Sequence, residues 1–327
     1  MPVMSYIEAI TSALKEEMQR DEKVFILGED VGKKGGVFRA TDGLYDEFGG
    51  TRVLDTPLAE SAIAGIGIGA AMYGLRPIAE MQFADFIMPA VNQIISEAAK
   101  IRYRSNNDWN APITIRAPYG GGVHGALYHS QSVESVFANQ PGLKIVMPST
   151  PYDVKGLLKA SIRDNDPVLF FEHKRAYRLL KGEVPDEDYA LEIGKADIKR
   201  EGSDITIITY GLSVHFTLQA SEKLAEEGID AHILDLRTVY PLDKEAIVKA
   251  AKKTGKVLLI TEDNKEGSII GEVAAIIAEN CLFDLDAPVQ RLAAPDAPSM
   301  PFAPTMEKYF MINPEKIEQA MRNLAEF

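Results

Sequence analysis

Residues 143–173, LKIVMPSTPYDVKGLLKASIRDNDPVLFFEH, contain the pattern that decides the fold. Two short apolar runs, 143–149 and 166–173, flank a stretch of helical length and period at 151–163. Buried strands joined by a helix are typical of a parallel sheet, because a parallel connection needs a crossover long enough to hold a helix. The segment therefore predicts one β-α-β unit of an α/β fold.

The same alternation extends in both directions from this segment. Toward the N-terminus lie β-rich runs at 23–30, 51–56, 76–83 and 111–119, with a helical stretch at 85–104. A second series has strands at 204–211, 229–236, 256–263 and 288–295. Charged residues with interspersed Pro and Gly separate the two series, as is typical of an exposed connection. We therefore expect two α/β domains, residues 1–185 and 204–327, joined by a linker at 186–203, with four strands in the second.

Composition limits the classes of partner. The chain has 327 residues, with 35 basic and 48 acidic side chains and a net charge of −13, which disfavours binding to nucleic acid or anionic lipid. The uncharged apolar stretch at 61–75 is shorter than the roughly 20 residues that cross a bilayer. Cys281 is the single cysteine, so an internal disulfide is excluded and a cytoplasmic location is expected. The acidic, helically patterned N-terminus predicts a first helix rather than a signal peptide.

The glycine-rich run AGIGIGA, residues 64–70, nominally matches the dinucleotide fingerprint Gly-x-Gly-x-x-Ala. That fingerprint needs its glycines at the turn between a strand and a helix, whereas Pro57 suits a first helical position and the glycines come later. We expect them inside a helix, where they allow close packing within the domain or across a subunit interface. The alternative interpretation of the chain as an NAD-dependent dehydrogenase rests on this match alone. Phosphate-loop, nucleophile-elbow and zinc-helix motifs are absent.

Two segments carry side chains suited to catalysis. Glu60, in DTPLAES at 55–61, lies in the first turn of the glycine-rich helix, where the helix dipole alone would favour a carboxylate. The loop YGGGVHGALYHSQS, residues 119–132, follows a predicted strand and contains His124 and His129. Ligands of open α/β sheets bind beyond the carboxyl ends of the strands, so this loop is a candidate for proton transfer or substrate binding.

Metal sites have weaker support. A zinc site built from His124, His129 and His173 is disfavoured, because their spacing fits no helical or hairpin pairing and no thiolate lies nearby. Asp164 and Asp166, in SIRDNDP at 161–167, follow a helix whose free carbonyls could help to hold a hard cation. A solvent-exposed helix end explains the same residues.

Longer blocks together resemble one family. They are GEDVGKKGGVFRAT (28–41), DTPLAES (55–61), EMQFADF (80–86), RAPYGGGVHGALYHSQS (116–132), PGLKIVMPSTPYDVKG (141–156), DPVLFFEHK (166–174) and DLRTVYPLD (235–243). Over essentially the whole chain they are similar to the β subunits of thiamine-diphosphate-dependent 2-oxo acid dehydrogenases, the decarboxylating first components of multienzyme complexes. HGALYHSQS, residues 124–132, most resembles the branched-chain 2-oxoisovalerate type rather than the pyruvate or acetoin types.

The resemblance implies a fold and partners. The fold is a pyrimidine-binding α/β domain followed by a transketolase C-terminal-like α/β domain. The assembly is an α2β2 heterotetramer with thiamine diphosphate at the α–β interface, and the α subunit holds magnesium and the diphosphate through a Gly-Asp-Gly…Asn-Asn motif. No Gly-Asp-Gly occurs in this chain, so we expect it to form half of an active site. Further expected partners are the lipoyl and peripheral-subunit-binding domains of the acyltransferase.

The resemblance also implies roles for individual residues. Glu60 matches a glutamate that hydrogen-bonds a pyrimidine ring nitrogen of the cofactor, and His129 matches a histidine that assists reductive acylation of the lipoyl group. Leu58 and Phe86 match residues that pack the pyrimidine and support the bent cofactor. Gln82, Glu29 and His124 lie in matching blocks, and of these Gln82 is an expected cofactor contact.

The resemblance finally implies a bound potassium ion and a particular reaction. Branched-chain members hold potassium, mostly through backbone oxygens, near the segments that match Ile113, Ser161, Asp164 and Asp166. The expected reaction, with the α subunit, is oxidative decarboxylation of branched-chain 2-oxo acids and acyl transfer to the lipoyl group. The alternatives are a pyruvate or acetoin dehydrogenase β subunit, or an assembly subunit whose acidic C-terminal domain docks the complex to the acyltransferase core.

Overall fold

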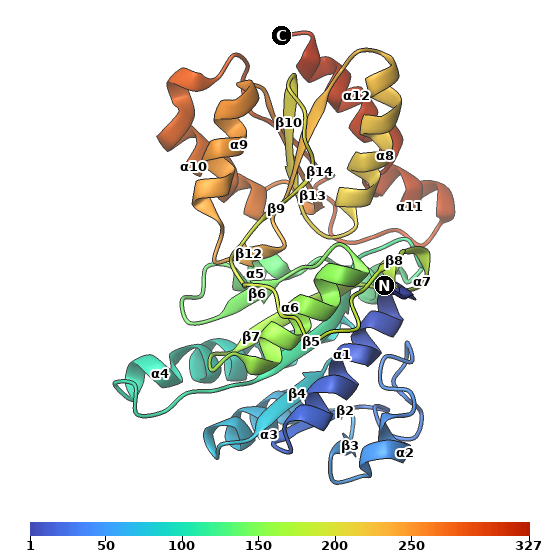
Figure 1. Ribbon diagram of the computed structural model, residues 1–327, viewed down its shortest axis with the longest axis vertical. Helices are drawn as coiled ribbons and strands as arrows, with labels where there is room; N and C mark the ends of the chain where they lie inside the picture. Colours follow the sequence, from blue (N-terminus) through green and yellow to red (C-terminus); the bar gives the residue numbers. More distant parts are fainter. The chain divides into compact units, whose positions relative to one another are not determined.

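The computed structural model describes residues 1–327 and divides into two compact units, each of which is α/β (Figure 1). The first unit comprises residues 1–119 and 136–193, and the second comprises 120–135 and 194–327. The histidine-containing loop therefore groups with the second unit, although it follows a strand of the first. No helix has the length and apolar character needed to span a membrane.

A parallel sheet forms the centre of the first unit. Its strands are β2 (Val24–Gly28), β3 (Val53–Asp55), β4 (Arg76–Glu80), β5 (Thr114–Tyr119), β6 (Lys144–Val146) and β7 (Val168–His173). They are ordered β6-β7-β5-β4-β2-β3, and every residue of β5 and β7 is buried. Because each strand is covered on two faces, its sequence is a nearly continuous apolar run, which is why the strands could be predicted. A small antiparallel pair joins β1 (Val3–Ser5) to β8 (Lys181–Glu183).

Helices cover the sheet of the first unit. They are α1 (Tyr6–Arg20), α2 (Leu44–Phe48), α3 (Glu60–Met72), α4 (Ile101–Arg104), α6 (Pro151–Arg163) and α7 (Ala176–Leu179), and the division of the chain between the units falls within α5 (Glu134–Phe137). The predicted helical stretch at 85–104 is broken into η1 (Ala84–Ala90), η2 (Gln93–Glu97), η3 (Ala98–Lys100) and α4. Pro89 lies inside η1 and has no backbone N–H to donate, so a regular helix cannot run through it.

The glycine-rich run lies inside α3, as the sequence predicts. A Cβ added to Gly67 would lie 2.7 Å from Cδ1 of Ile113, so the missing side chain lets α3 pack closely against this buried residue. A Cβ on Gly69 would meet nothing within 4 Å. Close packing therefore explains Gly67 but not Gly69.

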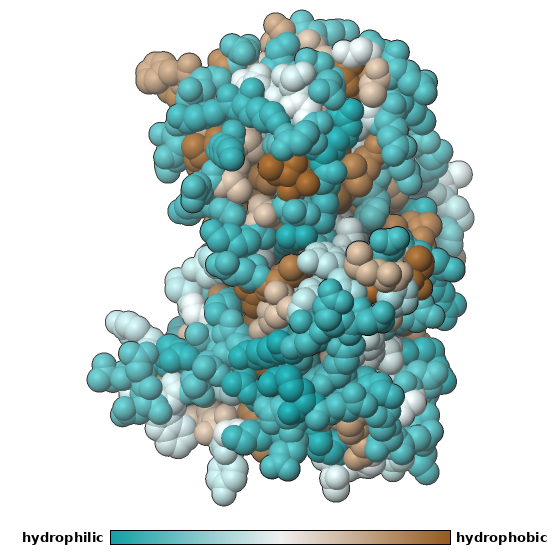
Figure 2. Space-filling model, viewed as in Figure 1, coloured by the Kyte–Doolittle hydropathy of each residue, from teal (hydrophilic) through white to brown (hydrophobic).

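Figure 2 shows one face of the molecule, where hydrophobic patches are scattered over a mainly hydrophilic surface.

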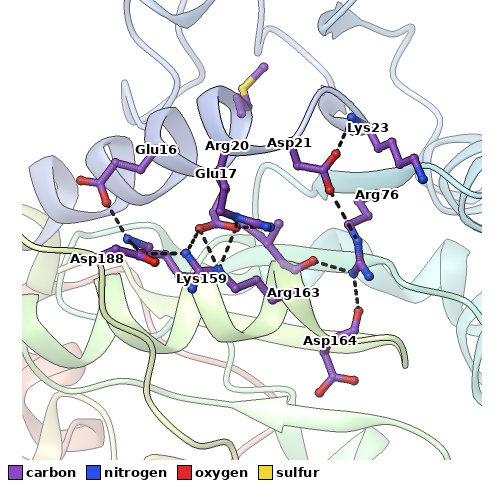
Figure 3. Close-up of polar contacts among 12 residues, drawn as sticks. Glu16, Glu17, Arg20, Asp21, Lys23, Arg76, Lys159, Arg163, Asp164 and Asp188 are labelled. Atoms are coloured by element: carbon purple, nitrogen blue, oxygen red, sulfur yellow. Dashed lines mark hydrogen bonds and ion pairs between the residues drawn. The ribbon is translucent and has the colours of Figure 1, made fainter.

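Helices α1 and α6 are joined by partly buried ion pairs (Figure 3). The side chain of Lys159 is 1% exposed, and its ammonium group lies 2.6 Å from a carboxylate oxygen of Glu16. Glu17 is fully buried and accepts hydrogen bonds from the guanidinium group of Arg163, the shortest at 2.6 Å. Burial opposes ionisation of Glu16, but hydrogen bonds from Lys155 and Lys159 outweigh it and lower the pKa of Glu16.

The second unit has a five-stranded sheet ordered β14-β13-β10-β11-β9. Its strands are β9 (Asp197–Arg200), β10 (Ile205–Thr209), β11 (Ala231–Asp235), β13 (Val257–Asn264) and β14 (Gln290–Ala294), and β12 (Thr238–Tyr240) lies outside this sheet. The helices are α8 (Ser213–Glu226), α9 (Lys244–Thr254), α10 (Ile269–Cys281), α11 (Pro304–Phe310) and α12 (Pro314–Ala325), with short turns η4 (Ala126–Tyr128) and η5 (Leu282–Asp284). In Figure 1, α9 and α10 cover one face of the sheet, and α8 and α12 cover the other.

Strand β9 corrects the sequence prediction at two points. It lies within 186–203, where we expected a linker, and it gives this sheet a fifth strand where we expected four. β9 pairs antiparallel with β11 at the sheet edge and has no fully buried residue. An edge strand of this kind needs no continuous apolar run, so its polar sequence is compatible with both a loop and a strand.

Candidate active site

Glu29 and Gln82 lie just beyond the carboxyl ends of β2 and β4, and Glu60 begins the helix that follows the neighbouring strand β3. Strands β2 and β4 are parallel neighbours, with Gly28 paired to Glu80, so the residues that follow them meet at one edge. There the side chain of Gln82 donates a hydrogen bond to the carboxylate of Glu29, and Glu60 lies close enough to act on it electrostatically. Burial raises the pKa of Glu29, and the negative charges of Asp30 and Glu60 raise it further.

Glu60 is the first residue of α3, as the sequence predicts. The preceding Ala59 provides no capping side chain, so Glu60 is the acidic group of this helix N-terminus. Its side chain is partly exposed, and Leu58 just before it is 69% exposed. Glu60 is therefore accessible to a ligand. It lies near Leu58, whose apolar side chain is not buried by other residues of this chain.

Aromatic side chains line the segment that follows β4. The rings of Phe86 and Phe83 pack edge to face with centroids 5.6 Å apart, and Phe83 packs in the same way against Phe38 at 5.4 Å. The ammonium group of Lys174 lies 5.6 Å from the centre of the Phe83 ring. Phe86 remains partly exposed, so it offers an apolar surface next to the polar cluster of Glu29, Gln82 and Glu60.

A buried ion network, not anticipated from the sequence, ties the strands together near this site. Arg116 on β5 donates to Glu80 on β4 at 2.7 Å and to both carboxylate oxygens of Glu172 on β7 at 2.6 and 2.8 Å. The hydroxyl group of Tyr177 donates to Glu172 at 2.7 Å. Burial raises the pKa of Glu80, although Arg116 opposes the shift. Charged residues within apolar strand runs were the available signal, but one sequence does not reveal that they pair.

The histidine-containing loop is anchored within the second unit. His124 Nδ1 lies 2.6 Å from Oε2 of Glu307, and the backbone N–H of Gly121 donates to Oε1 of Glu262 at 2.6 Å. The imidazole of His124 is exposed, whereas His129 is partly buried. Neither Glu262 nor Glu307 was predicted as a site residue.

The three histidines of the disfavoured zinc site have other surroundings. His173 lies in the first unit, where its ring packs against Tyr119 with centroids 5.0 Å apart and Nδ1 accepts the backbone N–H of Arg175 at 3.2 Å. His124 pairs with Glu307 in the second unit. No group of three or more His, Cys, Asp or Glu side chains has metal-binding geometry.

The residues predicted to surround potassium are close in the first unit but are already paired. Asp164 accepts from Lys144 Nζ at 2.5 Å, and Asp166 accepts from Arg102 Nε at 2.5 Å. Arg76 donates to the Asp164 carbonyl at 2.9 Å (Figure 3). The carbonyls of Ile113 and Ser161 accept the backbone N–H groups of Val168 and Asp164. These cationic partners do not fit a side-chain potassium site, so this site remains a prediction resting on carbonyl oxygens.

Comparison with known proteins defines the class. The family model of the transketolase pyrimidine-binding domain matches residues 3–179, and that of the transketolase C-terminal domain matches residues 194–317. A solved structure described as a split-gene transketolase, inactive β4 tetramer, has the same fold, with a TM-score of 0.80 at 23% identity over 99% of this chain and 98% of that one. The chain is thus a two-domain protein of the transketolase type, which confirms the predicted fold class.

Relatives with higher sequence identity define the family within this class. The chain is 80% identical to the 2-oxoisovalerate dehydrogenase subunit beta of Bacillus subtilis (strain 168) over the full length of both proteins. It is 48% identical to the pyruvate dehydrogenase E1 component subunit beta of the same organism, again over both full lengths. The Staphylococcus epidermidis subunit of that name (strain ATCC 12228 / FDA PCI 1200) is 45% identical over 99% of each chain. The chain therefore belongs to the family of 2-oxo acid dehydrogenase β subunits, and the resemblance in its sequence is confirmed.

Membership of this family and the pyrimidine-binding domain indicate thiamine diphosphate as the cofactor. The residues in the first unit fit the aminopyrimidine half of that molecule. A carboxylate at Glu60, a carboxylate–amide pair at Glu29 and Gln82, and the apolar surfaces of Leu58 and Phe86 match a flat ring with polar edges. The chain has no Gly-Asp-Gly sequence to match the diphosphate and its metal ion.

Proposed function

We propose that this chain is the β subunit of a cytoplasmic branched-chain 2-oxo acid dehydrogenase. With an α subunit in an α2β2 heterotetramer, it would catalyse thiamine-diphosphate-dependent oxidative decarboxylation of branched-chain 2-oxo acids and acylate the lipoyl group of an acyltransferase. The observation that carries the proposal is the full-length 80% identity to a 2-oxoisovalerate dehydrogenase β subunit, against 48% and 45% for pyruvate dehydrogenase β subunits.

Glu60 is the proposed catalytic residue of the first unit. When bound, thiamine diphosphate supplies an electron sink for the carbon that loses CO2. Glu60 would share a proton between its carboxyl oxygen and a pyrimidine nitrogen, a role that glutamine cannot fill because its amide does not titrate. The negative charge of Glu60 is one of the causes that raise the pKa of Glu29, so the two carboxyl groups are electrostatically coupled at this end of the site.

Neighbouring residues would orient the ring. The hydrogen bond from Gln82 would hold the carboxylate of Glu29 in one orientation. Phe86 and Leu58 provide apolar surface, and covering the exposed Leu58 would contribute roughly 1.5–3 kcal/mol of hydrophobic stabilisation. The α subunit would hold magnesium and the diphosphate. Potassium has no part in the proposed mechanism.

His129 is the proposed catalytic residue of the second unit. Its imidazole would assist acyl transfer to the lipoyl group by moving a proton or by stabilising developing charge. The lipoyl group is carried by the acyltransferase, whose lipoyl and peripheral-subunit-binding domains are the proposed macromolecular partners. Docking to that protein and catalysis are compatible roles of the same chain.

Reconstitution with the α subunit tests the proposal. We expect little thiamine diphosphate binding by this chain alone, activity after mixing, and a kcat/KM for 3-methyl-2-oxobutanoate at least roughly tenfold above that for pyruvate. In the assembled enzyme, Glu60→Gln should lower turnover by roughly 100- to 10,000-fold, whereas Glu22→Gln on an exposed turn should leave it unchanged. Preference for pyruvate would reject the substrate assignment, and a fully active Glu60→Gln enzyme would reject the mechanism.

A further inference from the structure

The loop at residues 120–135 contains an unusual density of left-handed backbone. Gly120 and Gly122 have φ values of 87° and 80°, and two residues with side chains, His124 and Ala126, have φ values of 56° and 54°. Left-handed conformations are unfavourable for residues that carry a Cβ, so contacts from outside the loop must stabilise this shape.

Glu307 on α11 supplies the most concentrated set of such contacts. Its side chain is 4% exposed, and Oε1 accepts the backbone N–H groups of Gly122 at 3.1 Å and His124 at 3.3 Å. Its Oε2 lies 2.6 Å from Nδ1 of the same His124. A single buried carboxylate thus binds both the backbone and the side chain of a strained residue. Hydrogen bonds to a charged acceptor are stronger than neutral ones.

Further contacts hold the loop on either side of this point. The backbone N–H of Gly121 donates to Glu262, and the side chain of Gln131 donates to Ser299 at 2.8 Å. A Cβ on Gly121 would lie 2.5 Å from Cε of Met300, so the loop backbone lies directly on the small core formed by Ala294, Met300, Phe310 and Met311. Glu307 lies on the helix that contributes Phe310 to this core. The anchor is therefore part of a packed element.

The anchored segment is in direct contact with His129. A Cβ on Gly125 would lie 2.7 Å from both the Cβ and the carbonyl oxygen of His129, so the chain between His124 and Ala126 folds back onto this histidine. A change in the left-handed turn would therefore move the backbone of His129. We propose that Glu307 is a positioning residue, which holds the turn at His124 and thereby sets the location of His129. The inference rests on the acyl-transfer role proposed above for His129.

The test uses Glu307→Gln in the assembled α2β2 enzyme, with Glu315→Gln on the exposed start of α12 as the matched control. The first measurement is amide hydrogen exchange at residues 120–135. We expect exchange at Gly122 and His124 to rise roughly tenfold or more in Glu307→Gln and to stay unchanged in the control. Unchanged exchange in Glu307→Gln would overturn the proposal.

The second measurement separates the two half-reactions. We expect lipoyl acylation to fall roughly 10- to 100-fold, while decarboxylation with an artificial electron acceptor stays within about twofold. Glu307→Asp, which keeps the charge, should recover part of the loss. Increased exchange with undiminished acylation would overturn the positioning of His129. If His129→Ala itself acylates normally, the role proposed for His129 fails, while the exchange measurement still decides whether Glu307 anchors the loop.

His124→Ala provides a milder variant if Glu307→Gln does not assemble. It removes the imidazole that pairs with Glu307 but leaves the carboxylate and both backbone donors in place. Exchange at Gly122 should then rise by a smaller factor than in Glu307→Gln. An unchanged exchange rate in this variant would contradict the anchor.

Discussion

The surroundings of Glu134 raise the pKa of its carboxyl group above the usual value for a glutamate. Its side chain is buried, Oε1 accepts from the hydroxyl group of Tyr210 at 2.8 Å, and Oε2 has no hydrogen-bond partner. Burial, together with the charge of Asp263, raises the pKa of Glu134 to about 8. The carboxyl group is therefore mainly neutral near pH 7 in the folded chain.

This shift predicts a loss of stability in alkali. The folded chain retains the Glu134 proton up to about pH 8, while the unfolded chain releases it near its ordinary value of 4.5. The stability contributed by the neutral form thus falls as the pH rises through this interval. Glu134→Gln, which does not ionise, should unfold at a higher temperature than the parent at pH 8.5 and at a similar temperature at pH 5.

Thermal unfolding of the full chain between about pH 5 and pH 9 would measure this difference. Glu279→Gln, at an exposed position of α10, is the matched control and should shift the unfolding temperature equally at every pH. A Glu134→Gln difference that is constant across the range would show that the carboxyl group does not retain its proton in the folded chain.

The family resemblance nominated Glu60 and His129 from the sequence, but nothing in the sequence indicated the residues that anchor the loop containing His129. Glu60 follows a strand and a proline, a local pattern that places it at a helix start. Glu307 is 183 positions from His124, and Glu262 is 141 positions from Gly121. No local pattern connects residues so distant in the chain, and a glutamate in a short helix is ordinary until its partner is known.

At the scale of elements, α1 and α6 are joined by charges rather than by apolar contact alone. Glu17 is fully buried between Arg163 and Arg20, whose guanidinium groups lie 2.6 and 2.8 Å from its carboxylate. Such pairs add little net stability compared with apolar packing, but removal of one partner leaves a charge poorly compensated. The interface is therefore sensitive to the loss of a single charge.

We expect Glu17→Gln to lower the free energy of unfolding by about 3 kcal/mol, because Arg163 and Arg20 would lose their charged acceptor at this interface. Urea unfolding of the full chain measures the change. Glu22→Gln, just beyond the end of α1 and exposed, should change it by less than about 0.5 kcal/mol. Equal effects of the two variants would show that these ion pairs do not join the helices.

Helices with clear periodicity and strands with apolar runs were predictable, including the edge strands β3 and β14, whereas the polar edge strand β9 was not. The run at 151–163 became α6 with the predicted bounds, because Thr150 caps it and Pro151 suits its first position. Strand β9 and the broken helix after β4 were missed. An edge strand needs no apolar run, and helical periodicity continues through short 3-10 and π turns with little change.

For the whole molecule, the net charge of −13 is the property that most directly concerns its assembly. A negative surface attracts a basic partner over about a Debye length, which is near 10 Å at 0.1 M salt. We expect the association rate of the α2β2 enzyme with the partner proposed above, the peripheral-subunit-binding domain of the acyltransferase, to fall roughly tenfold between about 0.05 and 0.3 M salt.

Stopped-flow mixing at several salt concentrations measures this rate, and the dissociation rate provides the internal control. Electrostatic steering changes mainly the rate of association, so dissociation should change much less. An association rate independent of salt would show that the excess of acidic side chains does not guide docking.

The sequence by itself determined the α/β class, the two-domain order, most strands and the family, because these depend on local apolar periodicity and on blocks of adjacent residues. Only the tertiary structure decided that Glu29 and Gln82 meet, that Arg116 joins three strands, and that Glu307 binds the turn at His124. Parallel strands bring together residues that are far apart in the chain, and the side-chain partners at their ends depend on strand order and register rather than on local sequence.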